Sequence, residues 1–336
     1  MCKLDRAAAI ERMNCLGKQR RPFLFVIDFT MRAPVVLPLD EVSEDEILYD
    51  VNGRSNVRDE VYVRDGDIPP FSFTHHPIEY DAYRNAFGKV RDNFVLGNTF
   101  LLNLTFPTRI STDLSMEEIF RFSRAKYRLF VKGKFVVFSP ECFVRISGNH
   151  ISSYPMKGTI DAAVPDAARV ILQDPKETAE HITIVDLIRN DIGMIAEKVR
   201  VRRFRYIDTL VTSEKILLQV SSEITGVLPD GFHASLGTIL FRMLPAGSIT
   251  GAPKKKTVEI ITDAEGYDRG YYTGVFGYYD GKSLESAVMI RFIEKFESGD
   301  LYFKSGGGLT IYSDPESEYQ ELIDKVYVPF SRNDKG

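Results

Sequence analysis

Four glutamates in this chain form two matched pairs, each near the start of a predicted helix. Glu177 and Glu180 follow one Asp-Pro dipeptide, and Glu318 and Glu321 follow another. Asp is a favoured N-cap residue and Pro suits the first helical position, so each Asp-Pro dipeptide predicts the start of a helix. Within a helix, the three-residue spacing puts both members of a pair on one face. Mg²⁺ prefers oxygen ligands such as these carboxylates. The pattern therefore permits a magnesium site, although acidic residues in a first helical turn also stabilise a helix without any metal.

Lys157 lies in the segment Tyr-Pro-Met-Lys-Gly-Thr, where its neighbours are apolar or small. A lysine that is partly removed from water has a lowered pKa, and its amine can then act as a nucleophile. A Gly-Asn dipeptide between two β-rich segments predicts a two-residue turn, and the resulting pairing places Glu141 opposite Met156 and close to Lys157. A carboxylic acid beside an amine nucleophile can protonate a departing hydroxyl. A structural salt bridge between the two residues is the alternative.

Two further features could bind an anion. Arg291 lies in an apolar strand, where a guanidinium needs an anionic partner, either a substrate or a carboxylate of the protein. Gly306, Gly307 and Gly308 permit close approach of the backbone and could offer N–H groups to an oxyanion, although a tight turn would explain them equally well. The segment from Gly247 to Lys254 resembles a phosphate-binding loop only superficially, because it lacks the Gly-Lys-Ser/Thr ending.

The composition describes a soluble globular protein, since 44% of the 336 residues are hydrophobic and 27% are charged, which suffices for a core. The 43 Lys and Arg against 47 Asp and Glu give a net charge of −4, so we expect no nucleic-acid partner. Three cysteines, an odd number without metal-type spacing, favour a reducing compartment. The N-terminus lacks an apolar signal core, and no stretch has the ~18 apolar residues of a membrane span, so we expect a cytoplasmic protein without membrane association.

Strand-rich and helical segments alternate in blocks, which predicts an α+β fold, a layered α/β sandwich. Helices are expected at residues 4–16, 80–97, 115–128 and 174–190 and after residue 314. Strands are expected at residues 23–29, 99–106, 134–138, 142–147 and 150–154 and within 274–304, with short strands and loops at 34–77. The two glutamate pairs lie 141 residues apart and would have to meet to share one metal ion. We therefore expect residues 1–336 to form a single domain.

Five motifs in this order resemble those of the chorismate-utilising enzymes. They are Pro155-Met-Lys-Gly-Thr159, Glu180 to Asp191, Gly247 to Lys254, Gly306 to Gly308 and Glu318 to Lys325. The resemblance is dense over residues 134–326 and weak in a reduced N-terminal region, residues 1–77. It implies a single chorismate-binding domain with two packed antiparallel sheets flanked by helices.

The resemblance also implies a Mg²⁺-dependent site that binds chorismate. Glu180 and Glu321 would be metal ligands, with Glu177 and Glu318 nearby, directly or through water. The residues implied to contact chorismate are Gly158, Thr159, Gln219, Tyr278, Arg291, Gly306, Gly307 and Gly308.

The third residue of the Pro-x-x-Gly-Thr motif differs between branches of this family. It is Ala in members similar to anthranilate synthase and Lys in members similar to aminodeoxychorismate synthase component I, and this chain has Lys157. In the lysine branch this side chain attacks the chorismate ring and expels the 4-hydroxyl, after which ammonia displaces the lysine. Glu141 matches the general acid of the family. The resemblance thus implies synthesis of 4-amino-4-deoxychorismate, for para-aminobenzoate and folate.

No amidotransferase signature is present, so ammonia is expected from a separate glutamine amidotransferase subunit in a heterodimer. One position departs from the family, because Gln219 replaces a histidine and an amide cannot act as acid or base. The short N-terminal region gives no reason to expect tryptophan feedback. The alternatives are an anthranilate or isochorismate synthase of the same family, or a non-catalytic chorismate-binding subunit, which only Gln219 favours.

Overall fold

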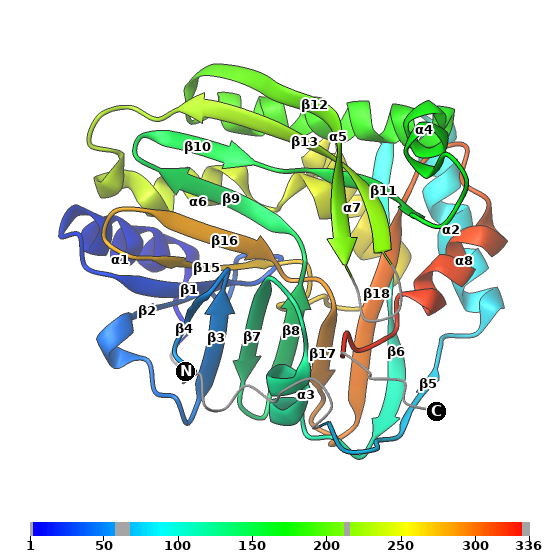
Figure 1. Cartoon of the computed structure of the whole chain (residues 1–336), viewed down its shortest axis with the longest axis horizontal. Helices are drawn as coiled ribbons and strands as arrows, with labels where there is room; N and C mark the ends of the chain where they lie inside the picture. The colour runs from blue at the N-terminus through cyan, green and yellow to red at the C-terminus, as the bar shows by residue number, and fades with distance from the viewer. Residues whose placement is uncertain (1–2, 58–67, 212–215, 331–336) are drawn as a thin grey trace. The chain divides into compact units, whose positions relative to one another are not determined.

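A computed structural model describes residues 3–57, 68–211 and 216–330 of the chain (Figure 1). Contacts within the chain group into two compact units. The first unit comprises Met1–Val42, Glu141–Ser248 and Gly274–Val288, and the second comprises Ser43–Pro140, Ile249–Thr273 and Met289–Gly336. The chain therefore passes between the units five times. The single-domain arrangement of residues 1–336 stays a prediction.

The first unit contains a nine-stranded antiparallel sheet in the order β11-β13-β10-β9-β16-β15-β1-β2, with β12 paired to β13. Its strands are β1 (Phe23–Ile27), β2 (Val35–Pro38), β9 (Cys142–Ser147), β10 (His150–Ser153), β11 (Met156–Asp161), β12 (Glu197–Val211), β13 (Ile216–Val227), β15 (Val275–Tyr279) and β16 (Leu284–Val288). Its α-helices are α1 (Arg6–Lys18), α4 (Ala167–Gln173), α5 (Pro175–Gly193) and α6 (Leu236–Met243). Helix α5 packs along β11, β12 and β13 (Figure 1).

The second unit contains another nine-stranded antiparallel sheet, in the order β14-β6-β18-β17-β8-β7-β3-β4, with β5 paired to β6. Its strands are β3 (Ile47–Val51), β4 (Arg54–Ser55), β5 (Phe73–His76), β6 (Leu101–Thr112), β7 (Tyr127–Val131), β8 (Phe135–Ser139), β14 (Gly251–Ala252), β17 (Phe292–Lys295) and β18 (Leu301–Leu309). Its α-helices are α2 (Tyr80–Val95), α3 (Met116–Phe122), α7 (Lys254–Glu265) and α8 (Pro315–Asp324). Helix α8 packs on β18 (Figure 1).

The predicted class is confirmed, because both units consist of an antiparallel sheet flanked by helices. Both helix starts that carry the glutamate pairs are also confirmed. Asp174 accepts a hydrogen bond from the backbone N–H of Glu177 at 2.8 Å, and Asp314 accepts one from Ser317 at 2.9 Å. Among the described residues, no helix combines the length and the apolar character needed to cross a membrane.

Two local predictions need correction. The helix expected at residues 115–128 ends at Phe122, because residues 127–131 are fully buried and pair as β7 between β3 and β8. The hairpin register is right at Ser147 and His150, but the pairing that would place Glu141 opposite Met156 is wrong. Strand β11 pairs with β13 instead, where Met156 lies opposite Ser221.

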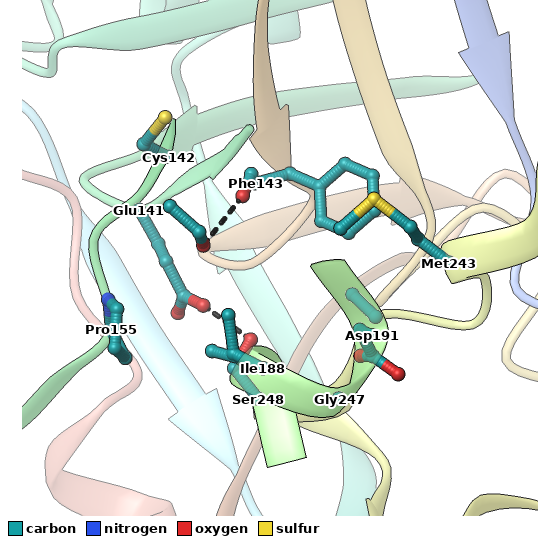
Figure 2. A pocket seen from close by; sticks show the side chains of 11 residues that line it. Glu141, Cys142, Phe143, Pro155, Ile188, Asp191, Met243, Gly247 and Ser248 are labelled. Carbon is teal, nitrogen blue, oxygen red and sulfur yellow. Dashed lines mark hydrogen bonds between the residues drawn. The ribbon is translucent and has the colours of Figure 1, made fainter. Parts of the chain in front are cut away.

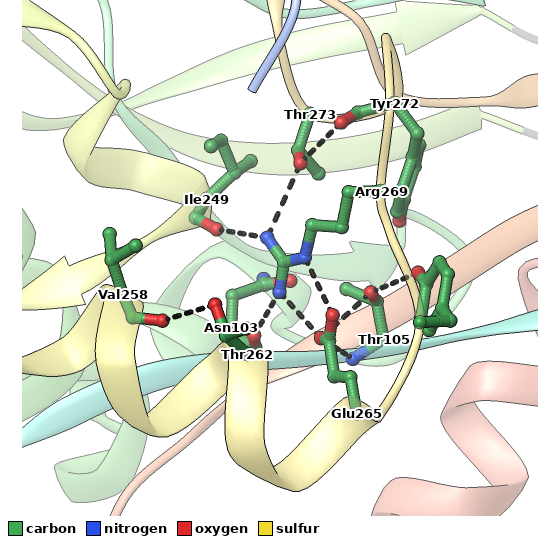
Figure 3. A network of polar contacts seen from close by, with 10 residues as sticks. Asn103, Thr105, Ile249, Val258, Thr262, Glu265, Arg269, Tyr272 and Thr273 are labelled. Atoms are coloured by element: carbon green, nitrogen blue, oxygen red, sulfur yellow. Dashed lines mark hydrogen bonds and ion pairs between the residues drawn. The ribbon is translucent and has the colours of Figure 1, made fainter. Parts of the chain in front are cut away.

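A buried ion pair supports strand β6 of the second sheet (Figure 3). Arg269 Nη2 lies 2.6 Å from Glu265 Oε1, and the two side chains are 1% and 0% exposed. Arg269 also donates to the backbone carbonyls of Asn103 at 2.6 Å and Ile249 at 3.1 Å, while Glu265 accepts from the backbone N–H of Thr105 at 2.7 Å. The ion pair thus holds β6, the strand against which Gly306, Gly307 and Gly308 of β18 are paired.

Candidate functional site

Lys157 and Glu180 form an ion pair in the first unit. Lys157 lies on β11 and Glu180 on the second turn of α5, and the two meet because this helix packs on that strand. Lys157 Nζ lies 2.5 Å from Glu180 Oε2, and the side chains are 25% and 4% exposed. The predicted nucleophile is thus partly buried and in contact with a predicted metal ligand.

Gly158 leaves room for the other glutamate of α5. Its φ of +83° is a left-handed conformation, and a Cβ atom at this position would lie 3.0 Å from Glu177 Oε2 and 3.2 Å from Ile171 Cδ1. Any side chain here would be strained and would crowd the carboxylate. The glycine of the Pro-x-x-Gly-Thr motif therefore lets Glu177 lie directly against the backbone that follows Lys157.

Glu141 lines a small pocket of the first unit together with Ser248, Pro155 and Asp191 (Figure 2). The Ser248 hydroxyl donates a hydrogen bond to the Glu141 carboxylate. Burial raises the pKa of Glu141, while the hydrogen bond from Ser248 and the positive charge of Lys157 lower it. A raised pKa keeps a carboxyl protonated closer to neutral pH, as a general acid requires.

Replacing Ser248 by Ala is expected to move the alkaline limb of the pH–rate profile to higher pH. Loss of a hydrogen bond that favours the carboxylate raises the pKa of Glu141 further, so the acid form persists to higher pH. The measurement is the pH dependence of kcat/KM for chorismate consumption. Ser153→Ala is the matched control, because Ser153 lines the same pocket but donates to the carbonyl of Phe143 at 2.9 Å. An unchanged or acid-shifted limb in Ser248→Ala would count against Glu141 as the acid.

Thr159 and Gln219 are neighbours, whereas Tyr278 is not next to them. Thr159 on β11 pairs with Gln219 on β13, and Gln219 Nε2 lies 3.4 Å from Thr159 Oγ1. Tyr278 lies on β15, and four strands separate β15 from β11 in the order of the sheet. The structure therefore does not put Tyr278 on a strand adjacent to that of Lys157.

Arg291 in the second unit has a left-handed backbone with φ of +53°, which is uncommon for a residue other than glycine and often marks a functional position. Its Nη1 donates to the carbonyl of Lys325 at 2.7 Å, and its guanidinium carbon lies 4.6 Å from the ring centre of Tyr327. Within residues 3–57, 68–211 and 216–330 it forms no ion pair with a carboxylate. The guanidinium is thus positioned by neutral groups, which suits recognition of an external anion.

Glu318 and Glu321 converge over the glycine run of β18. A Cβ atom on Gly307 would lie 3.3 Å from Glu321 Oε1 and 3.4 Å from Glu318 Oε2. Glu318 is only 3% exposed and accepts a hydrogen bond from Ser313 Oγ at 2.7 Å. Burial raises the pKa of Tyr83, and the negative charges of Glu318 and Glu321 raise it further.

Each glutamate pair has the donor chemistry of a magnesium ligand set. In the second unit both carboxylates lie near Gly307, and in the first unit Glu177 lies near Gly158, so a glycine leaves space beside each pair. Mg²⁺ is commonly bound by one or two carboxylates and keeps several waters. No group of three or more potential ligands among His, Cys, Asp and Glu occurs in the described parts of the chain, so neither pair is part of a larger preformed cluster.

Sequence reasoning missed two residues of this region, Lys325 and Ser248. Lys325 Nζ contacts Glu321 Oε1 at 2.5 Å and the Gly306 carbonyl at 2.8 Å. Its contact with Glu321 could have been predicted, because residues four positions apart on a helix are neighbours. The contact of Ser248 with Glu141 could not, because 107 residues separate them.

His181 is a packing residue, since it is 1% exposed and its Nε2 lies 2.7 Å from Ser222 Oγ. Burial, together with the charges of Arg205 and Lys157, lowers the pKa of His181 to about 4. The imidazole is therefore neutral at physiological pH.

The chain belongs to the chorismate binding enzyme family, whose model matches residues 64–331. An uncharacterised PabA-like protein of Pasteurella multocida is 50% identical over 96% of this chain and 98% of its own length. A protein of Haemophilus influenzae with the same description is 48% identical over 97% of both chains. Aminodeoxychorismate synthase component 1 of Salmonella typhimurium is 33% identical over 73% of this chain, and the match spans 56% of that protein.

Solved structures show the same fold. Anthranilate synthase component I of Streptococcus pneumoniae superposes with a TM-score of 0.63 at 27% identity, over 76% of this chain and 59% of the other. The menaquinone-specific isochorismate synthase of Escherichia coli superposes with a TM-score of 0.71 over 97% of this chain and 82% of the other, at only 16% identity. The latter similarity concerns the fold alone.

Proposed function

We propose that this protein converts chorismate and ammonia to 4-amino-4-deoxychorismate, for para-aminobenzoate and folate synthesis. The observation that carries the proposal is Lys157, an amine on β11 in the Pro-x-x-Gly-Thr motif, partly buried and held by Glu180 at 2.5 Å. The similarity to aminodeoxychorismate synthase component 1 of Salmonella typhimurium supports it.

In the proposed reaction the Lys157 ammonium first loses a proton to water, and the neutral amine then forms a bond from Nζ to a carbon of the chorismate ring. The C–O bond of the 4-hydroxyl breaks, and the proton of the Glu141 carboxyl leaves with that hydroxyl as water. Ammonia then forms a bond to C4, and the C–N bond to Lys157 breaks. The displaced lysine and Glu141 regain their starting protonation states by proton exchange with the incoming ammonia and water.

Arg291 is the proposed partner of a substrate carboxylate, because its guanidinium fork can hold two carboxylate oxygens. The backbone of Gly306, Gly307 and Gly308 would donate further N–H groups. The remaining proposed substrate contacts are Gly158, Thr159, Gln219 and Tyr278. We propose Glu177, Glu180, Glu318 and Glu321 as ligands of Mg²⁺, which when bound would neutralise negative charge on the dianionic substrate.

The test is incubation of the purified protein with chorismate, Mg²⁺ and an ammonium salt at alkaline pH, followed by chromatography. Loss of chorismate with appearance of the 4-amino product is the expected result, and a chorismate concentration that stays constant would reject the proposal. Fluorescent anthranilate would instead identify the alternative of an anthranilate synthase. Formation of isochorismate would identify the other enzymatic alternative.

We further propose that a separate glutamine amidotransferase subunit supplies the ammonia, in a cytoplasmic heterodimer. Glutamine should therefore replace ammonium salt only after that subunit is added. A non-catalytic chorismate-binding subunit is the alternative that Gln219 favours, because its amide cannot transfer protons as the family histidine can. Chorismate binding without turnover in the same assay would support that alternative.

A further inference from the structure

Lysine ammonium groups occupy one carboxylate of each candidate metal-binding pair. In the first unit Lys157 Nζ lies 2.5 Å from Glu180 Oε2. In the second unit Lys325 Nζ lies 2.5 Å from Glu321 Oε1. The two contacts belong to different elements and different units, yet in both cases the lysine contacts the glutamate that is expected to be the principal ligand. We infer that Lys157 and Lys325 are resident counter-ions that a divalent cation must displace from Glu180 and Glu321.

Charge and burial explain why the lysines lie there. Glu180 is 4% exposed, so without a cationic partner its carboxylate would be an uncompensated buried charge. Glu321 lies against Gly307 beside buried Glu318, where a second negative charge is repelled unless a cation is close. Each ammonium therefore reduces the repulsion that would otherwise accompany two neighbouring carboxylates.

The surroundings of Lys325 fit displacement better than those of an ordinary helix ion pair. Its ammonium also donates to the Gly306 carbonyl at 2.8 Å, and an ammonium has three donors. When a cation takes Glu321, Lys325 therefore keeps one partner at the glycine run. Lys157 differs from Lys325, because a cation that displaces Lys157 from Glu180 separates the proposed nucleophile from this carboxylate. Cation binding and release of Lys157 from its ion pair are thus one coupled event.

This inference rests on the proposed metal ligands, and it is tested by metal binding without any substrate. Mn²⁺ is the probe, because it suits the same oxygen ligands as Mg²⁺ and the free ion is counted by electron paramagnetic resonance. Lys157→Met and Lys325→Met are each expected to lower the Kd for Mn²⁺ about fivefold or more, since a competing ion pair is removed. Lys325→Arg keeps the competing charge and should bind Mn²⁺ no more tightly than the unmodified protein.

Lys256→Met is the matched control. Lys256 forms a 3.0 Å ion pair with Glu259 on α7, away from the two candidate pairs, and its removal should leave the Kd unchanged. A Kd in both Met variants within twofold of that of the unmodified protein would overturn the inference while leaving the proposed ligands in place. Absence of Mn²⁺ binding in every protein would instead reject the proposed ligands themselves. Lys325 is distant in sequence from β11, so the Lys325→Met variant still tests the inference if Lys157→Met does not fold.

Discussion

Lys157→Met is expected to lower the rate of 4-amino-4-deoxychorismate formation by at least about 10³-fold, because the variant lacks the amine that is proposed to attack the ring. Met has a similar length and apolar stem, so it should preserve packing on β11. The measurement is kcat/KM with chorismate, Mg²⁺ and ammonium salt. Lys256→Met, which removes an exposed lysine of α7, should retain the activity of the unmodified protein.

A second observation separates covalent attack from a merely electrostatic role of Lys157. In the absence of ammonia, the unmodified protein should accumulate an adduct with the mass of chorismate minus one water. Mass spectrometry of peptides should place that adduct on Lys157. Full activity of Lys157→Met would exclude a nucleophilic role. An adduct on another residue would assign the nucleophilic role to that residue instead.

Glu265→Leu is expected to reduce the free energy of unfolding by about 3–5 kcal/mol, since it leaves a buried guanidinium without its counter-ion. Arg269 is 2% exposed, and both its Nη2 and its Nε lie within 2.9 Å of the Glu265 carboxylate (Figure 3). The backbone N–H of Thr105 would also lose its acceptor. Urea denaturation followed by circular dichroism is the measurement.

Two companion variants show whether charge or volume causes that loss. Glu265→Leu combined with Arg269→Met removes both charges and should recover most of the lost stability, because a buried ion pair can often be replaced by apolar residues. Glu259→Leu breaks the exposed pair with Lys256 and should leave the free energy of unfolding nearly unchanged. If the single and double variants lose equal amounts of unfolding free energy, packing rather than charge causes the effect.

Features set by local chemistry were predictable from the sequence. Asp174 and Asp314 cap their helices as expected, because an N-cap depends on a few adjacent residues. The turn after Ser147 was predictable for the same reason. The exchange of partners after Ser153 was not, because pairing of β11 with β13 depends on residues some 60 positions downstream.

In the candidate site, too, local features were predictable from the sequence and long-range contacts were not. The grouping of Glu177 with Glu180 follows from helical periodicity, but the contact of Glu180 with Lys157 requires α5 to fold back over β11. The sequence pointed to Glu141 as a neighbour of Lys157 through a ladder that does not form. The positive charge of Lys157 nevertheless lowers the pKa of Glu141, and the Glu141 carboxylate accepts a hydrogen bond from Ser248.

The strand order of the second unit has a consequence for synthesis of the chain. Strand β18 lies between β6 and β17, so the long strand β6 cannot acquire this partner until residues 301–309 have left the ribosome. Until then β6 presents unpaired backbone groups and apolar side chains such as Leu102 and Leu104, which are 0% and 1% exposed once folded. Such an edge readily pairs with other chains. Nascent chains that stall before β18 should therefore depend on chaperones far more than the completed protein does.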